Sequence, residues 1–225
     1  MPARSLKVAF VAAVRPFSSP ILGGLLVLLL AAAPARAQQD TDVVAKVTRI
    51  QHAAVALQDA LPRVLQAGSP IQLGDIISTG KGARLEMAFT DGTLVKLGAR
   101  AQFTVVEYVV NEISGKALMR ILDGAFNVSS GKLMQLADAS MVVETNTATI
   151  GIRGTQFWGG DIGNGFEIAL IEGKGIDVKT KLDDVAITQP GDGTRVSAGS
   201  LPPTEPLPWE PEKLARAVAT ISFDD

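Results

Sequence analysis

The stretch Val142-Val143-Glu144-Thr145-Asn146-Thr147-Ala148-Thr149-Ile150-Gly151-Ile152-Arg153-Gly154-Thr155-Gln156-Phe157-Trp158 decides the fold. Its first half alternates small or apolar residues with polar ones, which is typical of a half-buried strand. Gly151 and Gly154 then interrupt the pattern, and glycine inside a strand indicates a bulge, a bend or a close backbone approach. The strand pattern resumes at Thr155. We therefore predict a corner between two strands, with Arg153 held between the two glycines.

On both sides of this corner, turn signals recur about every 8 to 12 residues, with almost no helical periodicity between them. Asp91-Gly92, between the alternating segments 83–90 and 93–97, is a strong hairpin signal. Many short strands require a closed or stacked arrangement, because free strand edges aggregate. We predict an all-β fold, either a solenoid-like (β-helix-like) stack or an elongated sandwich of short strands, with a short C-terminal helix.

Three segments depart from the strand pattern. Residues 132–138 are the one short helical possibility inside the β domain. Residues 201–211 contain five prolines, which indicates an extended linker. Residues 211–221 fit a short helix with proline in its first turn. The apolar side of this helix comprises Leu214, Ala217, Val218 and Ile221. We expect the helix to cap the open end of the β domain, in preference to binding a partner.

The chain is predicted to have five parts. They are a signal peptide (1–37), a linker (38–42), a β domain (43–199), a proline-rich linker (200–211) and a C-terminal helix and tail (212–225). Basic residues precede an apolar run at 21–33, and Ala35-Arg36-Ala37 fits the small-x-small cleavage pattern. Cleavage after Ala37 makes the remainder periplasmic or secreted. The alternative is an uncleaved anchor, because residues 16–35 are uncharged and just long enough to span a membrane.

Composition excludes several kinds of chemistry. With 20% charged and 47% hydrophobic residues, the chain of 225 residues can form one domain with a core. It contains no cysteine, which excludes disulfides and thiolate metal sites, and its single histidine, His52, excludes a histidine-rich site. Removing the four basic residues of 1–37 changes the formal net charge from −2 to −6. An acidic domain without a basic stripe is unsuited to nucleic acid, and we predict neither a nucleic-acid partner nor a cofactor.

Acidic side chains are the first candidates for catalysis. Asp75, Asp91 and Asp123 each adjoin a glycine at a predicted turn, where aspartate bonds its own backbone. The glutamates in or beside strands are Glu86, Glu107, Glu144 and Glu172. Nothing in the sequence pairs two of them as a glycosidase requires. Residues 161–165 lack the ligand spacing of a calcium loop and favour a hairpin turn. No nucleophile elbow or phosphate-binding loop occurs, so we predict a protein without enzymatic activity and without a metal site.

Arg153 is the residue for which a functional and a structural interpretation compete. A guanidinium can bind a carboxylate or phosphate through two parallel hydrogen bonds. The internal alternative is an ion pair with Glu144 or Glu172 that locks the bend. We favour the internal pair.

A collinear set of motifs resembles the FecR protein domain, named for the periplasmic part of an iron-transport regulator. The motifs are LGDIISTG (73–80), FTDGTLVKL (89–97), LDGAF (122–126), VET (143–145) followed by IGIRGTQF (150–157), and IEGKGIDV (171–178). The resemblance covers roughly residues 43–180. Its marker residues are Gly74, Asp75, Asp91, Gly92, Gly124, Thr145, Gly151, Arg153, Gly154, Thr155 and Gly173. Asn146 departs from the family, which usually has proline after the threonine.

The resemblance implies an exported, non-enzymatic β domain. In the iron-transport regulators it receives a signal from an outer-membrane transporter, while a cytoplasmic anti-sigma segment acts on a sigma factor. We expect this chain to lack that segment, because too few residues precede the apolar run. The leading expectation is a binding, scaffolding or signal-sensing module for a protein or glycan partner in the cell envelope. The alternatives are a membrane-tethered signalling protein and, ranked last, a glycan-acting enzyme.

Overall fold

A computed structural model describes residues 43–197, 199 and 201–224. The predicted signal peptide (1–37) and first linker (38–42) lie outside the described residues, as do residues 198, 200 and 225. The described residues belong to one compact unit. None of the helices within the described ranges has the length and hydrophobicity that a membrane span requires.

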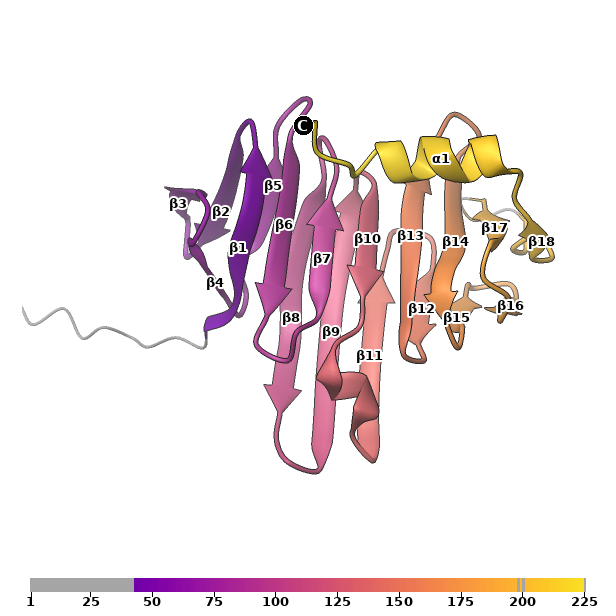
Figure 1. Ribbon diagram of the computed structural model, residues 1–225, viewed down its shortest axis with the longest axis horizontal. Helices are drawn as coiled ribbons and strands as arrows, with labels where there is room; N and C mark the ends of the chain where they lie inside the picture. The colour runs from indigo at the N-terminus through magenta and orange to yellow at the C-terminus, as the bar shows by residue number, and fades with distance from the viewer. Residues whose placement is uncertain (1–42, 198, 200, 225) are drawn as a thin grey trace, which may run out of the picture. The chain divides into compact units, whose positions relative to one another are not determined.

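Among the described residues, two nine-stranded sheets face each other across a shared core (Figure 1). The front sheet contains, in spatial order, β18 (Leu207–Pro208), β17 (Asp192–Val196), β14 (Phe166–Gly173), β13 (Thr155–Asp161), β10 (Phe126–Ser129), β7 (Leu94–Leu97), β6 (Arg84–Phe89), β1 (Val43–Gln51) and β4 (Pro70–Gln72). The back sheet contains β16 (Asp184–Ile187), β15 (Ile176–Lys179), β12 (Thr149–Ile152), β11 (Asp138–Glu144), β9 (Ser114–Asp123), β8 (Gln102–Val110), β5 (Ile76–Thr79), β2 (Ala54–Gln58) and β3 (Leu61–Val64).

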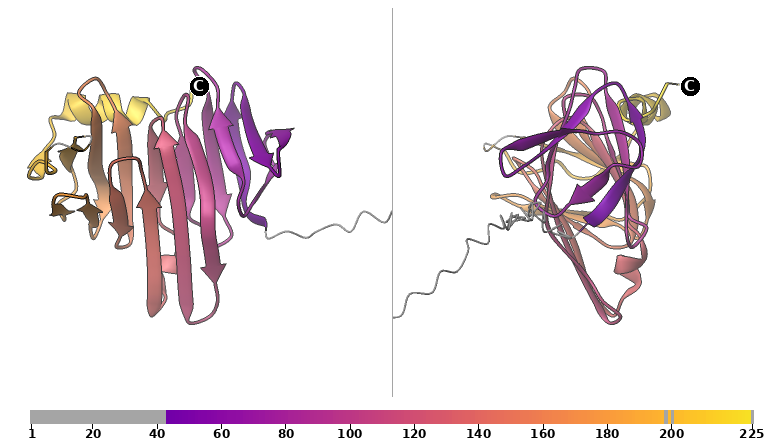
Figure 2. Two further views of the ribbon diagram at one scale, coloured as in Figure 1. Left: turned by 180° about the vertical axis from the view of Figure 1, so that it is seen from behind. Right: turned by 90° about the vertical axis from the view of Figure 1, so that its left-hand side faces the viewer.

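The chain passes repeatedly from one sheet to the other and advances along both as it does so. The β6–β7 hairpin lies in the front sheet, β8–β9 in the back sheet, β13–β14 in the front sheet and β15–β16 in the back sheet. Figure 2 shows the back sheet from behind, with β9 and β11 running parallel. The predicted all-β fold is therefore confirmed: two sheets form a sandwich, and the chain visits them in a solenoid-like order.

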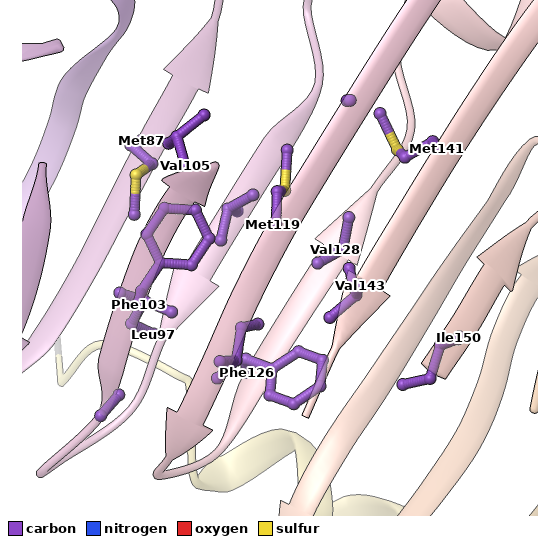
Figure 3. Close-up of a cluster of buried hydrophobic side chains, with 14 of the residues drawn as sticks. Met87, Leu97, Phe103, Val105, Met119, Phe126, Val128, Met141, Val143 and Ile150 are labelled. Carbon is purple, nitrogen blue, oxygen red and sulfur yellow. The ribbon is translucent and has the colours of Figure 1, made fainter. Parts of the chain in front are cut away.

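The core lies between the two sheets, because alternate residues of each strand point inward. In β6, Leu85, Met87 and Phe89 are buried, whereas the residues between them are partly exposed. Side chains from both sheets form a single apolar cluster (Figure 3). At its centre the Phe126 ring meets the Phe157 ring edge-on, with centroids 5.8 Å apart. Each fully buried side chain of this size contributes about 1.5–3 kcal/mol to folding.

The stretch 142–158 contains two turns, where the sequence predicted one corner. The first, at 145–148, separates β11 from β12; it was missed because its residues continue the alternation of polar and apolar types. Gly151 lies inside β12, paired with Val142 on one side and Asp177 on the other. The predicted interruption at Gly151 was therefore wrong. The crossing from the back sheet to the front sheet is confined to Arg153 and Gly154, where Gly154 has φ +73°.

Two short helices accompany the sheets. Residues 132–138 contain the 3₁₀ helix η1 (Lys132–Gln135), and α1 (Pro211–Ala219) is the C-terminal helix. Ala217 and Ile221 are buried against Trp158 on the outer face of the front sheet, where α1 crosses β13 and β14 (Figure 1). The helix therefore covers part of a sheet face, in contrast to the predicted cap. Val218, expected on the buried side, is 38% exposed. Within the predicted linker, β18 pairs with β17.

Candidate functional site

A groove of about 490 Å³ lies where turns from both sheets meet the end of α1. The turn segments 99–100, 122–125 and 145–147 line it, together with Asp161 and Phe166 of the β13–β14 hairpin. Arg84, Ile121, Phe126 and Thr220 complete the lining. Of the family marker residues, Gly124 and Thr145 lie in this groove. Its volume is in the range of about 300–1,000 Å³ that is usual for sites that bind small molecules.

Gly124 allows two of these turns to pack closely. It has φ +79°, and a Cβ atom at this position would lie 2.5 Å from the Cα of Ala101. The neighbouring turn is fixed by the buried Thr79, whose hydroxyl donates to the Gly98 carbonyl at 2.7 Å and accepts from the Ala101 amide at 2.7 Å. Any side chain at position 124 would therefore push apart turns that are held from within the core.

Thr145 and Asn146 connect the third turn to the second. The Thr145 hydroxyl donates to the Ala148 carbonyl and accepts from the Ala148 amide, both at 3.0 Å. The Asn146 side-chain amide donates to the Leu122 carbonyl at 2.5 Å. Proline, the usual family residue here, has no such donor. The departure from the family pattern thus supplies a hydrogen bond between two walls of the groove.

Arg100 is the groove residue that sequence reasoning missed. It has φ +54°, a left-handed conformation that is uncommon for residues other than glycine. Its side chain is exposed, and its guanidinium has no hydrogen-bond or ion-pair partner in the described part of the chain. The backbone conformation is set by hydrogen bonds around it, including the Arg100 amide to the Gly80 carbonyl at 3.1 Å. The nearby Gly98 predicts a turn, but Arg100 is neither glycine nor asparagine, so its residue type gives no signal for this conformation.

Arg84 and Asp161 are two charged groove residues that, unlike Arg100, have defined partners. The Arg84 guanidinium donates to the Ser222 carbonyl at 3.1 Å and the Ala83 carbonyl at 2.8 Å, so it holds the segment after α1 against the groove. Asp161 accepts from the amides of Gly163 and Gly165 at 2.6 and 3.2 Å. This is the predicted hairpin turn. No three His, Asp or Glu side chains converge on a possible metal position within the described residues.

Asp75 and Asp91 are buried. Each accepts a hydrogen bond from within its own turn and another from a residue outside that turn. Asp75 Oδ2 accepts from Arg63 at 2.6 Å and from the Gln72 amide at 2.8 Å. Asp91 Oδ2 accepts from the Thr93 hydroxyl at 2.8 Å and from the Leu133 amide at 3.1 Å. Neither aspartate lines the groove. Their adjoining glycines, Gly74 and Gly92, adopt φ +84° and +85° at the predicted turns.

Tyr108 joins the two sheets through Asp91. Its hydroxyl donates to Asp91 Oδ1 at 2.8 Å, and the Phe89 and Tyr108 rings lie 5.2 Å apart. Burial raises the pKa of Tyr108 to about 12, and the negative charge of Asp91 adds to the increase. The tyrosine therefore stays neutral and serves as a donor at physiological pH.

Arg153 binds Asp177, which corrects the predicted partners Glu144 and Glu172. Glu144 is instead bound by Arg120 at 2.7 Å. Close by, the buried Thr155 donates its hydroxyl to the Gly175 carbonyl at 2.9 Å. Gly173, with φ +106°, has no space for a side chain, because a Cβ would lie 2.5 Å from the Gly154 carbonyl oxygen. These residues form the corner between β12, β13 and β15, away from the groove.

The fold and groove define a β-sandwich domain whose turns build a recess at one end. Residues 75–174 match the family model described as FecR protein. The resemblance predicted from the sequence is therefore confirmed over residues 75–174.

Two crystal structures share part of this fold. Both are of a "putative anti-sigma factor" from Parabacteroides distasonis ATCC 8503, at 1.65 and 2.50 Å resolution. Each is 16% identical to this chain, with a TM-score of 0.50. The match covers 62% of this chain and 62% of that chain, which is less than two thirds of the neighbour's length. The likeness therefore concerns the fold. No curated protein matches this sequence.

Proposed function

We propose that this chain is a non-enzymatic, signalling-related protein of the cell envelope that binds a protein or glycan partner through its FecR domain. The observation that carries the proposal is the groove, because two family marker residues, Gly124 and Thr145, shape its walls. A rigid frame with binding residues on its connecting turns is a common arrangement for recognition. The exposed, unpaired Arg100 at this groove supplies a hydrogen-bond donor for a partner.

The absence of enzymatic activity is supported by what the candidate acids bind. Glu86 pairs with Lys96 at 3.3 Å, Glu107 with Lys116 at 2.9 Å and Glu144 with Arg120 at 2.7 Å. Each of these glutamates is ion-paired with a basic residue on an adjacent strand, which favours a structural role. Asp75 and Asp91 are likewise occupied by internal hydrogen bonds. A carboxylate pair for glycan hydrolysis finds no support among these groups.

The export signal predicted from the sequence supports the proposed cell-envelope location. Residues 1–37 combine a basic start, an apolar run and the Ala35-Arg36-Ala37 pattern. Mass spectrometry of the protein isolated from the cells that encode it tests this location. A mature N-terminus at Gln38 supports a periplasmic or secreted protein. An intact N-terminus in the membrane fraction supports the alternative, a tethered signalling protein related to the iron-transport regulators.

The binding function is tested by in-cell cross-linking and affinity capture with the full chain. The decisive variant is Arg100→Gly, since glycine readily adopts the left-handed conformation at this position and the fold is preserved. Asp59→Gly is the matched control, because Asp59 also has a left-handed φ, +49°, but lies in the β2–β3 turn away from the groove. We expect a protein or glycan that the wild type and Asp59→Gly capture and Arg100→Gly loses. Capture that is equal for all three proteins would contradict a role for the groove.

A further inference from the structure

The positively and negatively charged side chains that line the groove are equal in number. Its charged side chains are two arginines, Arg84 and Arg100, and two aspartates, Asp123 and Asp161. Together they carry no net formal charge, so the groove provides no long-range attraction for a phosphate or for a cation. The ligand that fits such a lining is neutral overall and rich in hydrogen-bonding groups.

Donor and acceptor atoms remain free on both kinds of charged residue. The Arg100 guanidinium has no partner in the described chain. Asp123 uses Oδ1 to accept from the Gly124 amide at 2.8 Å, and Asp161 uses Oδ1 for its own turn. Among the hydrogen bonds of the described residues, neither aspartate uses Oδ2. A hydroxyl group can both accept from a guanidinium and donate to a carboxylate.

The strain at Arg100 is the second observation that points to a ligand. Four residues other than glycine have positive φ in the described chain, and Arg100 is the one that lines the groove. Strained residues persist where the surrounding structure holds them, and they concentrate at binding sites. The hydrogen bonds of Thr79, Gly80 and Ala101 hold this turn, so the guanidinium is carried on a fixed backbone. A positioned donor loses less entropy on binding.

The apolar part of the groove includes an aromatic ring. Phe166 is half-buried and stacks on Phe126, with centroids 6.4 Å apart and ring planes 27° apart. An exposed ring edge or face in a polar groove can pack against the C–H groups of a sugar ring. The groove is lined by turns and by residues of β6, β9, β10, β13 and β14, and each of these strands has a neighbour on both sides. An extended peptide therefore finds no backbone ladder to join, as it does in strand addition.

From these features we infer that the groove binds a neutral oligosaccharide segment, with Arg100 donating to ring or hydroxyl oxygens and the free oxygens of Asp123 and Asp161 accepting from hydroxyls. This inference rests on the proposed function, since it names the ligand class of the same groove. The binding is non-covalent. Sugar specificity arises from the spacing of the donor on one turn and the acceptors on two others.

Isothermal titration calorimetry of the full chain tests the inference with three neutral probes, chitotetraose, maltotetraose and cellotetraose. Tetragalacturonate and tetra-alanine are the anionic and peptide probes. We expect at least one neutral tetrasaccharide to bind, and Arg100→Gly to weaken its binding roughly tenfold or more, as loss of a hydrogen bond to a charged group does. Asp123→Asn keeps the Oδ1 acceptor and replaces the free Oδ2 with an NH₂ donor. We expect a similar loss of affinity for the tetrasaccharide. Asp59→Gly binds like the wild type.

Three results would overturn the inference: none of the neutral tetrasaccharides binds, tetragalacturonate or tetra-alanine binds in their place, or binding is unchanged by Arg100→Gly. The wild-type and variant unfolding temperatures, measured in parallel, show that each variant is folded. The test of the proposed function is separate from the test of the sugar ligand. A protein captured in cells in an Arg100-dependent way, without any saccharide binding, removes the sugar ligand but leaves the binding function intact.

Discussion

Arg153 donates two parallel hydrogen bonds to Asp177, from Nε to Oδ2 and from Nη2 to Oδ1, both 2.7 Å long. The contact joins the corner after β12 to the neighbouring strand β15. Gly151 is paired directly with Asp177 across these strands and has no side chain beside the carboxylate. The arginine that marks the family pattern thus fastens the corner internally, through an aspartate in the next motif.

Replacing Arg153 tests how much this contact stabilises the fold. The Arg153 side chain is 60% exposed and that of Asp177 28%, so the pair is largely solvated. We expect Arg153→Ala to lower the free energy of unfolding by about 0.5–1 kcal/mol, measured by urea denaturation, and to leave partner capture unchanged. Arg153→Lys should restore only part of the loss, because an ammonium cannot form both bonds. Equal stability of Arg153→Ala and the exposed-site control Lys174→Ala would show that the contact contributes nothing.

Alanine substitutions at Gly124 and Gly154 distinguish the cost of backbone strain from the cost of steric overlap. Both have positive φ, +79° and +73°, but a Cβ at 124 meets the Ala101 backbone whereas a Cβ at 154 meets nothing within 4 Å. We expect Gly154→Ala to cost about 1 kcal/mol from strain alone. Gly124→Ala adds overlap with fixed backbone and should cost about 3 kcal/mol or more. Similar midpoints of chemical unfolding for the two variants would show that the turns at 98–101 and 122–125 can separate.

Local sequence patterns predicted the strands well because each strand is short and has one buried face. The alternation in 83–90 became β6, and the Asp91-Gly92 signal became the turn before β7. The partner of Arg153 was not predictable in this way. Glu144 and Glu172 were chosen as nearby acids, but the β12–β15 register places Asp177 beside the arginine. Register between strands of distant sequence depends on the packing of the whole sheet.

The groove was also beyond sequence reasoning, for a related reason. It is formed by turns from β7–β8, β9–β10, β11–β12 and β13–β14, which meet only after the chain has passed several times between the sheets. Gly124 and Thr145 were identified as marker residues, but their shared location was not. Arg100 has a left-handed backbone without a residue type that signals one, because hydrogen bonds to Thr79 and Gly80 impose it.

Docking of α1 depends on a small buried residue, and two alanines of the helix provide a matched test. Within the helix, Ala217 is fully buried and packs in a cluster with Trp158, whereas Ala219 is exposed. We expect Ala217→Asp to release the helix, because an unpaired charge cannot be buried there. Cleavage by a protease in 201–211 should then accelerate roughly tenfold or more, as for a segment that opens locally. Ala219→Asp should be cleaved like the wild type, and equal rates for both variants would contradict the docking contact.

Tyr108 makes stability depend on pH at the alkaline end. It is the single tyrosine of the chain, so the absorbance of its phenolate reports on this site alone. Burial, and then the charge of Asp91, raise its pKa from 10.0 to about 12. A group whose folded pKa is raised stabilises the fold fully below its unfolded value, and this contribution is lost as the pH rises from about 10 to 12. We expect the phenolate to form with a midpoint near 12 while circular dichroism still shows the folded protein.

Two variants give the control for this titration. Tyr108→Phe should abolish the part of the stability loss between pH 10 and 12 that belongs to this residue. In Asp91→Asn the negative charge beside the hydroxyl is gone but the burial remains, so the Tyr108 midpoint should move only part of the way back towards 10. A wild-type midpoint near 10 in the folded protein would mean that the tyrosine is solvated, and that the bridge from Tyr108 to Asp91 does not persist in solution.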